Sequence, residues 1–203
     1  MKKGLLLIIS GPAGSGKGTV LSLLLAGRDD FVYSVSMTTR PPRPGEVDGV
    51  NYHFVSHETF NRLAEQGGLL EFTRYCGNGY GTPRKQAEEV LASGRNLILE
   101  IEVDGAMQVK AKFPEAVSIM LLPPSYKVQE ARLRGRGTET EEKIQARLAQ
   151  TRREIPMLSQ YDYLVRNAEG GAAQAASDLL AIVRAEQLKT SRDPGAAERY
   201  FTE

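Results

Sequence analysis

The sequence predicts an α/β fold of three layers, in which helices cover both faces of a parallel central sheet. Residues 5–9, 97–99 and 117–122 are apolar runs without polar alternation, which is typical of strands buried on both faces. Helical patterns separate these runs, and this alternation favours a parallel sheet. The chain has 203 residues, enough for one compact domain with subdomains and a sizeable core.

The first predicted strand, at 5–9, runs directly into a glycine-rich turn and then into an apolar helix. Gly11, Gly16 and Lys17 have the G-x-x-x-x-G-K spacing of a P-loop. The glycines leave backbone N–H groups free to face phosphate oxygens, and the helix start adds its positive end. Lys17 supplies a point charge for the β- and γ-phosphates. Nucleotide phosphates are therefore expected on Gly11, Pro12, Ala13, Gly14, Ser15, Gly16, Lys17, Gly18 and Thr19.

The end of this motif departs from the strict pattern, because Gly18 stands where Ser or Thr is usual. The hydroxyl on the Mg²⁺ side must then come from Thr19 or be replaced by water. The alternative is a glycine-rich strand-to-helix turn with an exposed lysine. The buried strand before the turn and the apolar helix at 20–25 after it supply the context that a P-loop requires.

A second strand is predicted at 31–36, followed by a proline-broken loop at 37–46 that cannot be a helix or a central strand. Arg40 and Arg43 lie close together in this loop. Guanidinium groups pair bidentately with phosphate, so the two arginines predict a phosphate clamp, which the prolines stiffen. A solvated basic loop is the alternative.

Short elements are expected next. They are a strand at 51–55, a helix at 56–64, a strand at 69–75, a turn at 77–79 and a helix from 83 to about 94. Ser56 is the expected N-cap of the first helix, and Thr82 is that of the second, with Pro83 at its first position.

Carboxylates appear at the far end of the strand predicted at 97–102. Glu100 and Glu102 are two residues apart, so both should point to one face of this strand. Ligands of open α/β sheets bind outside the carboxyl ends of the strands, where the P-loop also lies. The two acids are therefore expected to converge on the P-loop, with a solvated strand end as the alternative.

The last third of the chain is predicted to alternate helices and strands. Helices are expected at 104–113, from the N-cap Ser125, from a Thr138–Glu141 capping box to 155, and at 172–189, with strands at 117–122 and 163–165. Arginines and glycines at 132–141 indicate a hinged basic lid, or else an ordinary solvated helix pair. The polar residues after Lys189 are expected to fray.

Composition excludes several classes of protein. The formal net charge of +1 gives no basic footprint for nucleic acid or membranes, and no apolar run approaches a membrane span. The single cysteine, Cys76, cannot form an internal disulfide and fits a reducing cytoplasm. His53 and His57 lack a metal-binding pattern, so no protein metal site of their own is expected. The sequence leaves the oligomeric state open, a homo-oligomer included.

From about Leu5 to Asn167 the sequence resembles bacterial guanylate kinases, a family of P-loop nucleoside monophosphate kinases. The motifs are 11–19, 34–46, 77–82 and 135–142. The resemblance implies one domain over 1–203, with a core at 1–36, 95–133 and 157–203, an inserted GMP-binding subdomain at 37–94 and a lid at 134–156. It implies transfer of the γ-phosphoryl group of ATP to GMP, and to dGMP, with Mg²⁺ accompanying ATP.

The resemblance also implies roles for residues. The GMP phosphate would be held by Arg40, Arg43, Tyr52 and Tyr80, and guanine would be read by Glu71, Ser36 and Thr82, with Glu100 also at the GMP site. ATP would contact the P-loop, Arg132, Arg136 and Asn167. Charge in the transfer step would be neutralised by Lys17, Arg40, Arg136 and Arg147. Metal contacts would come from Thr19 and, through water, from Glu102.

Four positions depart from the family pattern. Glu102 stands where Asp is usual, Val103 where an aromatic residue is usual, Asp104 where Gln is usual, and Ala168 where Asp commonly follows the asparagine. The rival hypotheses are another nucleoside monophosphate kinase and a non-catalytic guanylate-kinase-like binding module. Glu71 with the hydroxyls of Ser36 and Thr82 argues against the first. The retained Lys17 and the lid arginines argue against the second.

Overall fold

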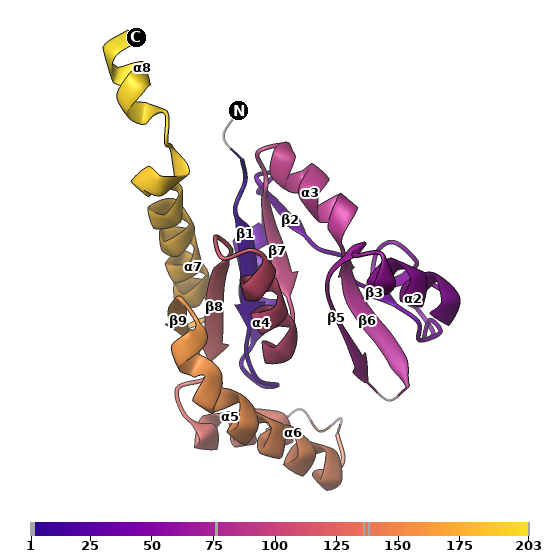
Figure 1. Cartoon of the computed structure of the whole chain (residues 1–203). Coiled ribbons are helices and arrows are strands. Elements are labelled where there is room, and N and C mark those ends of the chain that lie inside the picture. The colour runs from indigo at the N-terminus through magenta and orange to yellow at the C-terminus, as the bar shows by residue number, and fades with distance from the viewer. Residues whose placement is uncertain (1–2, 76, 136, 138, 203) are drawn as a thin grey trace.

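The computed structural model of the protein describes residues 3–75, 77–135, 137 and 139–202. The strands of its central sheet are all parallel and run in the order β2-β7-β1-β8-β9, so β1 lies in the middle (Figure 1). They are β1 (Leu6–Ser10), β2 (Phe31–Tyr33), β7 (Asn96–Glu100), β8 (Val117–Leu122) and β9 (Tyr163–Arg166). The predicted parallel sheet is confirmed.

Helices cover both faces of this sheet. They are α1 (Lys17–Leu25) and α7 (Ala172–Gln187) on one face, and α3 (Arg84–Ala92) and α4 (Val103–Lys112) on the other. Leu7 and Ile9 of β1 pack on the α1–α7 side, whereas Leu6 and Ile8 pack on the α3–α4 side. Because β1 is buried on both faces, it carries apolar side chains without alternation. The three predicted layers are therefore also confirmed.

A second, mixed sheet stands beside the core, in the order β4-β3-β6-β5 (right in Figure 1). Its elements are β3 (Met37–Thr38), β4 (His53–Phe54), β5 (Leu69–Tyr75), β6 (Asn78–Pro83) and the covering helix α2 (His57–Glu65). Phe60 of α2 is fully buried, with its ring edge-on to Phe72 at 6.2 Å between centroids. A Cβ on Gly79 would lie 2.6 Å from the Phe60 ring, so the strand needs glycine there.

Several boundaries in this region differ from prediction, and β6 already begins at Asn78, within the turn predicted at 77–79. The strand predicted at 31–36 ends at Tyr33, and Met37–Thr38, expected in a loop, form β3. The prolines at 41, 42 and 44 follow this strand and so do not interrupt it. Thr82 was expected to cap a helix, but β6 continues to Pro83, which is the N-cap itself. The Thr82 hydroxyl donates instead to the Glu71 carboxylate.

The strand predicted at 97–102 is also shorter than expected. β7 ends at Glu100, and Glu102 is the N-cap residue of α4. The two carboxylates therefore do not share one strand face, and that prediction is wrong. The cause is the early start of α4 at Val103, whose side chain is buried in the core.

The predicted lid region consists of α5 (Tyr126–Gly135), α6 (Glu141–Glu154) and the 3₁₀ helix η1 (Ile155–Gln160). Leu133, Ile144 and Leu148 form a small apolar cluster that packs against Ala13 of the P-loop. The expected capping box is wrong, because the N-cap of α6 is Thr140. Thr138 lies outside the described residues. Glu141 ion-pairs with Arg134 of α5 rather than returning to the cap.

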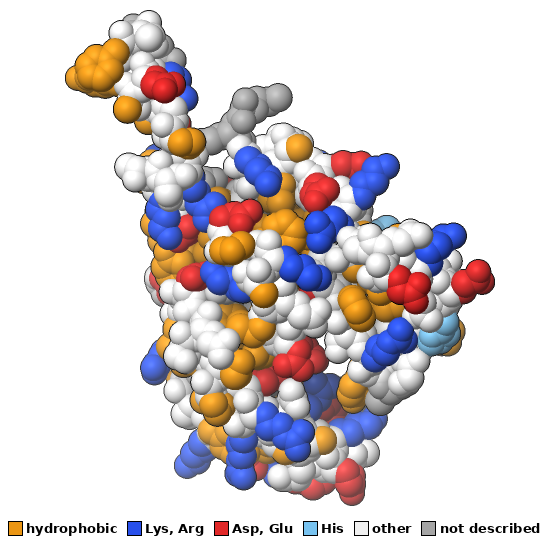
Figure 2. All heavy atoms as spheres, in the orientation of Figure 1, with side chains coloured by type: hydrophobic (Ala, Val, Ile, Leu, Met, Phe, Trp, Pro, Cys, Tyr) orange, Lys and Arg blue, Asp and Glu red, His pale blue; other side chains and the backbone are white. Residues whose placement is uncertain are grey.

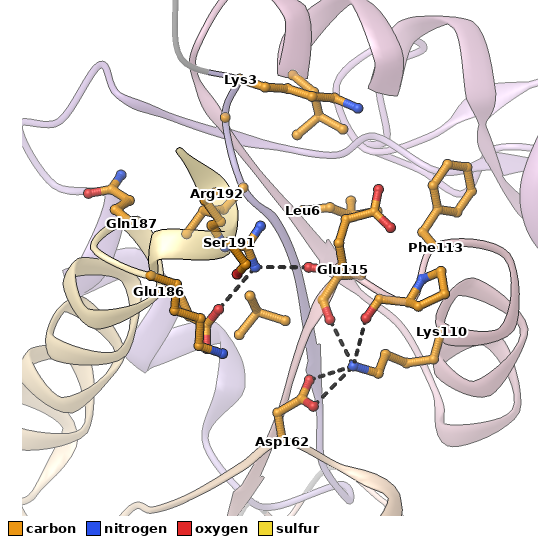
Figure 3. A pocket seen from close by; sticks show the side chains of 17 residues that line it. Lys3, Leu6, Lys110, Phe113, Glu115, Asp162, Glu186, Gln187, Ser191 and Arg192 are labelled. Carbon is orange, nitrogen blue, oxygen red and sulfur yellow. Dashed lines mark hydrogen bonds and ion pairs between the residues drawn. The ribbon is translucent and has the colours of Figure 1, made fainter. Parts of the chain in front are cut away.

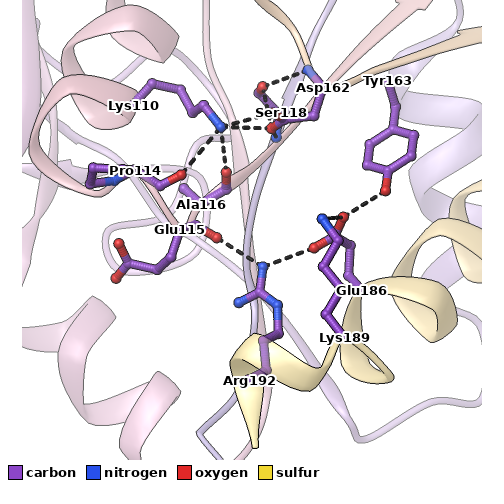
Figure 4. Close-up of polar contacts among 10 residues, drawn as sticks. All are labelled: Lys110, Pro114, Glu115, Ala116, Ser118, Asp162, Tyr163, Glu186, Lys189 and Arg192. Atoms are coloured by element: carbon purple, nitrogen blue, oxygen red, sulfur yellow. Dashed lines mark hydrogen bonds and ion pairs between the residues drawn. The ribbon is translucent and has the colours of Figure 1, made fainter. Parts of the chain in front are cut away.

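The C-terminal segment, expected to fray, forms η2 (Thr190–Arg192) and α8 (Ala196–Thr202). Arg192 donates to the Glu186 carboxylate at 3.0 Å and to the Glu115 carbonyl at 2.9 Å (Figure 4). Tyr163 and Lys189 also bind Glu186, which is 1% exposed. This network fixes η2 on the core. In the described part of the chain, no helix has the length and apolarity needed to cross a membrane.

Candidate active site

The P-loop joins β1 to α1, and its carbonyl groups are held by side chains from elsewhere in the fold. Gln129 donates to the Ala13 carbonyl at 2.9 Å, Arg132 to that of Gly14 at 3.5 Å, and Asn167 to that of Ser15 at 2.8 Å. These three bonds, together with the Ser15 N–H that donates to the Pro12 carbonyl at 3.1 Å, hold the loop in one conformation, so the start of α1 can present its backbone N–H groups to an anion. Arg132 and Asn167, predicted near ATP, therefore contact the loop directly.

Two properties of the P-loop require glycine at particular positions: a positive φ angle, and a lack of space for a Cβ atom. Gly14 and Gly16 have φ values of 84° and 86°, in the left-handed region. A Cβ on Gly11 would lie 2.2 Å from the Leu121 carbonyl oxygen, and one on Gly16 would lie 2.3 Å from the Asn167 side-chain nitrogen. Nothing lies within 4 Å of a Cβ built on Gly18. The position that departs from the strict motif is therefore the one with space for a side chain.

Lys17, at the start of α1, donates to the Gly11 carbonyl across the P-loop. The charge of Lys17 acts on Glu154 at the end of α6, together with those of Glu102 and Asp104. Burial raises the pKa of Glu154, the two neighbouring carboxylates raise it further, and Lys17 opposes them. Lys17 therefore lies near acidic side chains at the carboxyl ends of the strands. A site with both charges could bind phosphates through the lysine and a metal ion through the carboxylates.

Arg40 is fixed at the centre of a clamp on the second sheet. Its guanidinium makes two hydrogen bonds of 2.9 Å to the Glu46 carboxylate and lies 5.5 Å from the centre of the Tyr52 ring. Tyr80 packs edge-on to Tyr52, with centroids 6.1 Å apart. Glu46 also accepts from the Arg43 backbone N–H at 2.7 Å. The hydrogen bond with Arg40 lowers the pKa of Glu46, so this carboxyl stays ionised.

Glu71 and Thr82 form a buried polar pair between the two sheets. Glu71 is 4% exposed, and the Thr82 hydroxyl donates to its Oε1 at 2.7 Å. Burial raises the pKa of Glu71, and the Thr82 hydrogen bond and the Lys112 charge oppose this. A Cβ on Gly105 of α4 would lie 2.9 Å from Glu71 Oε2, so a glycine lets the carboxylate reach its place.

Glu100 and Ser36 are the two further residues predicted for the GMP site. Glu100, at the carboxyl end of β7, accepts a hydrogen bond of 2.9 Å from the Tyr33 hydroxyl. Burial raises the pKa of Tyr33, and the neighbouring charge of Glu100 raises it further. Ser36 is half-buried directly before β3, and its carbonyl accepts from the backbone N–H of His53.

The region predicted to be the lid consists of largely exposed helices. Arg147 of α6 pairs with Glu139, with 2.6 Å between Nε and the carboxylate oxygen. Arg136, predicted to bind ATP and to act in catalysis, lies outside the described residues. Figure 2 shows a recess between the lobe of the second sheet, on the right, and helices α5 and α6 at the bottom, with basic side chains set back inside it.

A cavity of about 430 Å³ lies at the opposite, amino-terminal edge of the central sheet (Figure 3). Most of the charged groups that line it pair with one another: Lys110 with Asp162 at 2.7 Å, and Glu186 with Lys189 and Arg192 at 2.6 and 3.0 Å. These pairs leave little charge for a phosphate. The P-loop edge is therefore the better candidate for the active site.

Comparison with known proteins identifies the family. The family model for guanylate kinase matches residues 3–185. The chain belongs to the guanylate kinase family. A guanylate kinase from Halalkalibacterium halodurans is 51% identical over 191 residues, covering 94% of this chain and 93% of the relative. One from Clostridioides difficile is 46% identical over 192 residues, covering 95% and 93%.

A solved structure agrees with this assignment. The crystal structure of guanylate kinase from Anaplasma phagocytophilum superposes with a TM-score of 0.74 at 36% identity, covering 95% of this chain and 90% of that one. The resemblance stated from the sequence motifs is thus confirmed, and so is the P-loop fold.

Among the residues predicted for this guanylate kinase family member, the structure groups Arg40, Tyr52 and Tyr80 in one cluster and Glu71 with Thr82 in another. Glu102 and Thr19 are both exposed at the P-loop edge. Sequence reasoning gave no role to Glu46, Tyr33, Gly105 or Gln129. For Glu46 a signal was available, because it is the acid nearest to the two arginines in the chain. For Gln129, within a charged helix, there was none.

Proposed function

We propose that the chain binds GMP on the second sheet and ATP on the P-loop, and that the γ-phosphoryl group passes between them. ATP-dependent phosphorylation of GMP is the activity of the guanylate kinase family, and neither rival hypothesis is favoured. The observation that carries the residue assignment is the buried Glu71 carboxylate with its Thr82 hydroxyl, because this pair has the chemistry to select one base.

Guanine presents N1–H and an exocyclic amine side by side, so one carboxylate accepts from both. Adenine has a lone pair at N1, which would face the lone pairs of Glu71. In a buried site the wrong base leaves polar groups unpaired, and such a site rejects it by roughly 10⁴-fold or more. Ser36 and Thr82 would complete the contacts with guanine, and dGMP, which carries the same base, is a second acceptor.

The GMP phosphate would lie against Arg40, Arg43, Tyr52 and Tyr80, with Glu100 closing the site. Glu46 prepares this clamp, because its two hydrogen bonds hold the Arg40 guanidinium in place before the ligand arrives. The rings of Tyr52 and Phe54, 5.5 and 5.8 Å from the guanidinium carbon, fix its other side. On this account the phosphate either joins the Arg40–Glu46 pair or displaces Glu46 from it.

ATP would place its phosphates on residues 11–19 and against Arg132, and its base near Asn167; both side chains are already bonded to the loop. Mg²⁺ fits the groups present, since Thr19, Glu102 and Asp104 offer oxygen ligands at this edge. The described residues hold no cluster of three His, Cys, Asp or Glu side chains able to bind a metal alone. Thr19, phosphate oxygens and waters oriented by Glu102 would therefore hold Mg²⁺, which shields phosphate charge when bound.

The transfer step brings two anions together, so positioning and charge neutralisation are what the protein must supply. Lys17, Arg40, Arg136 and Arg147 would neutralise the transferring group. No general base is needed, because the accepting phosphate is already an anion. The lid at 134–156 would exclude water and so prevent hydrolysis of ATP. The chain would work in the cytoplasm, as a single domain with the subdomain 37–94 closing on the core, and as a monomer or a homo-oligomer.

The proposal is tested by measuring ADP release with GMP, dGMP, AMP or UMP as the acceptor, at saturating ATP and Mg²⁺. We expect turnover with GMP and dGMP and a loss of at least about 10⁴-fold in kcat/KM with AMP. A preference for AMP or UMP would indicate another nucleoside monophosphate kinase. No turnover with any acceptor would indicate a non-catalytic binding module.

A further inference from the structure

Gln129 of α5 links the P-loop to the lid helix α6. Its side-chain nitrogen Nε2 donates to the Ala13 carbonyl at 2.9 Å and to the Thr151 hydroxyl at 2.7 Å. Gln129 is 1% exposed and Thr151 is 3% exposed. Both protons of one buried amide are thus used, one on the phosphate-binding loop and one on the lid.

The connection continues along α6. The Thr151 hydroxyl donates to the Arg147 carbonyl at 3.0 Å, and Arg147 carries a guanidinium that would neutralise charge during transfer. A chain of hydrogen bonds therefore runs from the Ala13 carbonyl to the backbone of Arg147. It bypasses the exposed Arg147–Glu139 ion pair, which water and salt weaken.

The packing around Gln129 leaves the distance between the P-loop and α6 to be set by these hydrogen bonds. Leu133, Ile144 and Leu148 pack against Ala13 beside them. A cavity of about 140 Å³, lined by Pro12, Gln129 and Thr151 among others, adjoins the junction. Because the space on that side is not filled by side chains, packing alone does not fix the distance between the loop and α6. The bonds of Gln129 do so, and breaking them would leave buried polar groups unpaired.

We propose that Gln129 and Thr151 are positioning residues that couple the ATP-binding loop to the arginine-bearing helix α6. The inference rests on the proposed binding of ATP to the P-loop. Gln129 holds the Ala13 carbonyl turned away from the phosphates, and Thr151 places the turn of α6 that starts at Arg147. Loss of either contact weakens ATP binding and lets the lid close loosely, while the GMP site on the second sheet is unaffected.

Gln129→Met and Thr151→Val remove the donor and the hydroxyl with little change in volume. We expect either variant to raise the KM for ATP about threefold to tenfold, which is the range for one or two buried hydrogen bonds. The KM for GMP should stay within about twofold. The share of ATP hydrolysed without GMP should increase, because a loosely held lid admits water. Thr151→Ser, which keeps the hydroxyl, should restore the KM for ATP.

Matched controls are available far from the P-loop. Thr202 donates to the Glu198 carbonyl four residues before it, as Thr151 does to that of Arg147, and Gln174 bonds Asp178 on the exposed face of α7. Thr202→Val and Gln174→Met should leave both KM values unchanged. A melting temperature for each variant separates loss of stability from loss of coupling.

The double variant decides between coupling and separate effects. If the two residues act through one bond, the KM for ATP of Gln129→Met/Thr151→Val equals that of the stronger single variant rather than the product of both changes. A multiplicative effect, or unchanged KM values together with a lowered melting temperature, would overturn the proposal. The ATP affinities of the same variants can also be measured by calorimetry without GMP. Absence of GMP turnover would refute the proposed function, whereas the calorimetric affinities would still test the coupling between Gln129 and Thr151.

Discussion

Among single residues, the proposed selectivity for guanine would depend most on how Glu71 is held. The carboxylate is buried, accepts from Thr82 through Oε1 and faces Gly105 through Oε2. Burial opposes the charged form, so each neighbour that fixes its orientation matters more than it would in water. Gly105 contributes to this orientation by leaving room for the carboxylate, and not through a side-chain hydrogen bond.

Gly105→Ala tests this role. The new Cβ would lie 2.9 Å from Glu71 Oε2, so the carboxylate must shift by a few tenths of an ångström and lose alignment with its partners. We expect the KM for GMP to rise roughly tenfold, the loss of about one well-made hydrogen bond to a charged group. The KM for ATP is the internal control and should not change. Unchanged GMP kinetics would mean that Glu71 is free to move.

Among the elements, the P-loop and α1 show why the motif tolerates Gly18 but not a change at Gly16. Gly16 has a φ of 86° and no space for a Cβ, whereas Gly18 lies in the first turn of α1 with open space around it. Helix propensity therefore favours a side chain at position 18, and both backbone strain and crowding oppose one at position 16.

We predict opposite effects on stability for two alanine substitutions. Gly18→Ala should raise the free energy of unfolding by about 0.5–1 kcal/mol, the usual gain of alanine over glycine in a helix. Gly16→Ala should lower it by about 2 kcal/mol or more, through strain and a clash with Asn167. Urea unfolding of both variants measures the difference. Equal values for the two would contradict the crowding around Gly16.

For the whole molecule, the two ends of the parallel strands in the central sheet carry different kinds of residues. The carboxyl edge carries the P-loop and the acidic groups. The amino-terminal edge carries the cavity and the network of Glu186, Tyr163, Lys189 and Arg192, which fixes η2 on the core (Figures 3 and 4). Stability and catalysis should therefore be separable by substitution at the two edges.

Arg192→Met tests this separation. Removing the guanidinium leaves the buried Glu186 with fewer partners, so the free energy of unfolding should fall by about 1–3 kcal/mol. The kcat and both KM values should stay the same. Arg184→Met, on the exposed side of the neighbouring helix, is the matched control and should change neither property. A change in kcat for Arg192→Met would show that the two edges communicate.

Local sequence patterns predicted most of this molecule. The apolar runs located the core strands, and the motif spacing located the P-loop, because both signals are carried by residues adjacent in the chain. The failures needed tertiary information. Thr82 could not be told from a helix cap without Glu71 beside it, and the order of η2 at the start of the tail depends on Arg192 reaching Glu115 and Glu186. The role of Gln129 depends on Thr151, which is 22 residues further along the chain.

The most direct test of the account is the acceptor specificity of Glu71→Gln. The amide cannot accept from both guanine donors, so kcat/KM for GMP should fall by about 10²-fold or more while ATP affinity stays within about twofold. Burial raises the pKa of Glu71 above its ordinary value. As the pH rises from the ordinary pKa through the raised one, ionisation of this buried carboxyl therefore lowers the free energy of unfolding. The variant should therefore melt no lower than the parent at pH 8, which excludes misfolding as the cause. Unchanged GMP turnover in a stable Glu71→Gln variant would contradict the central claim that this carboxylate reads the base.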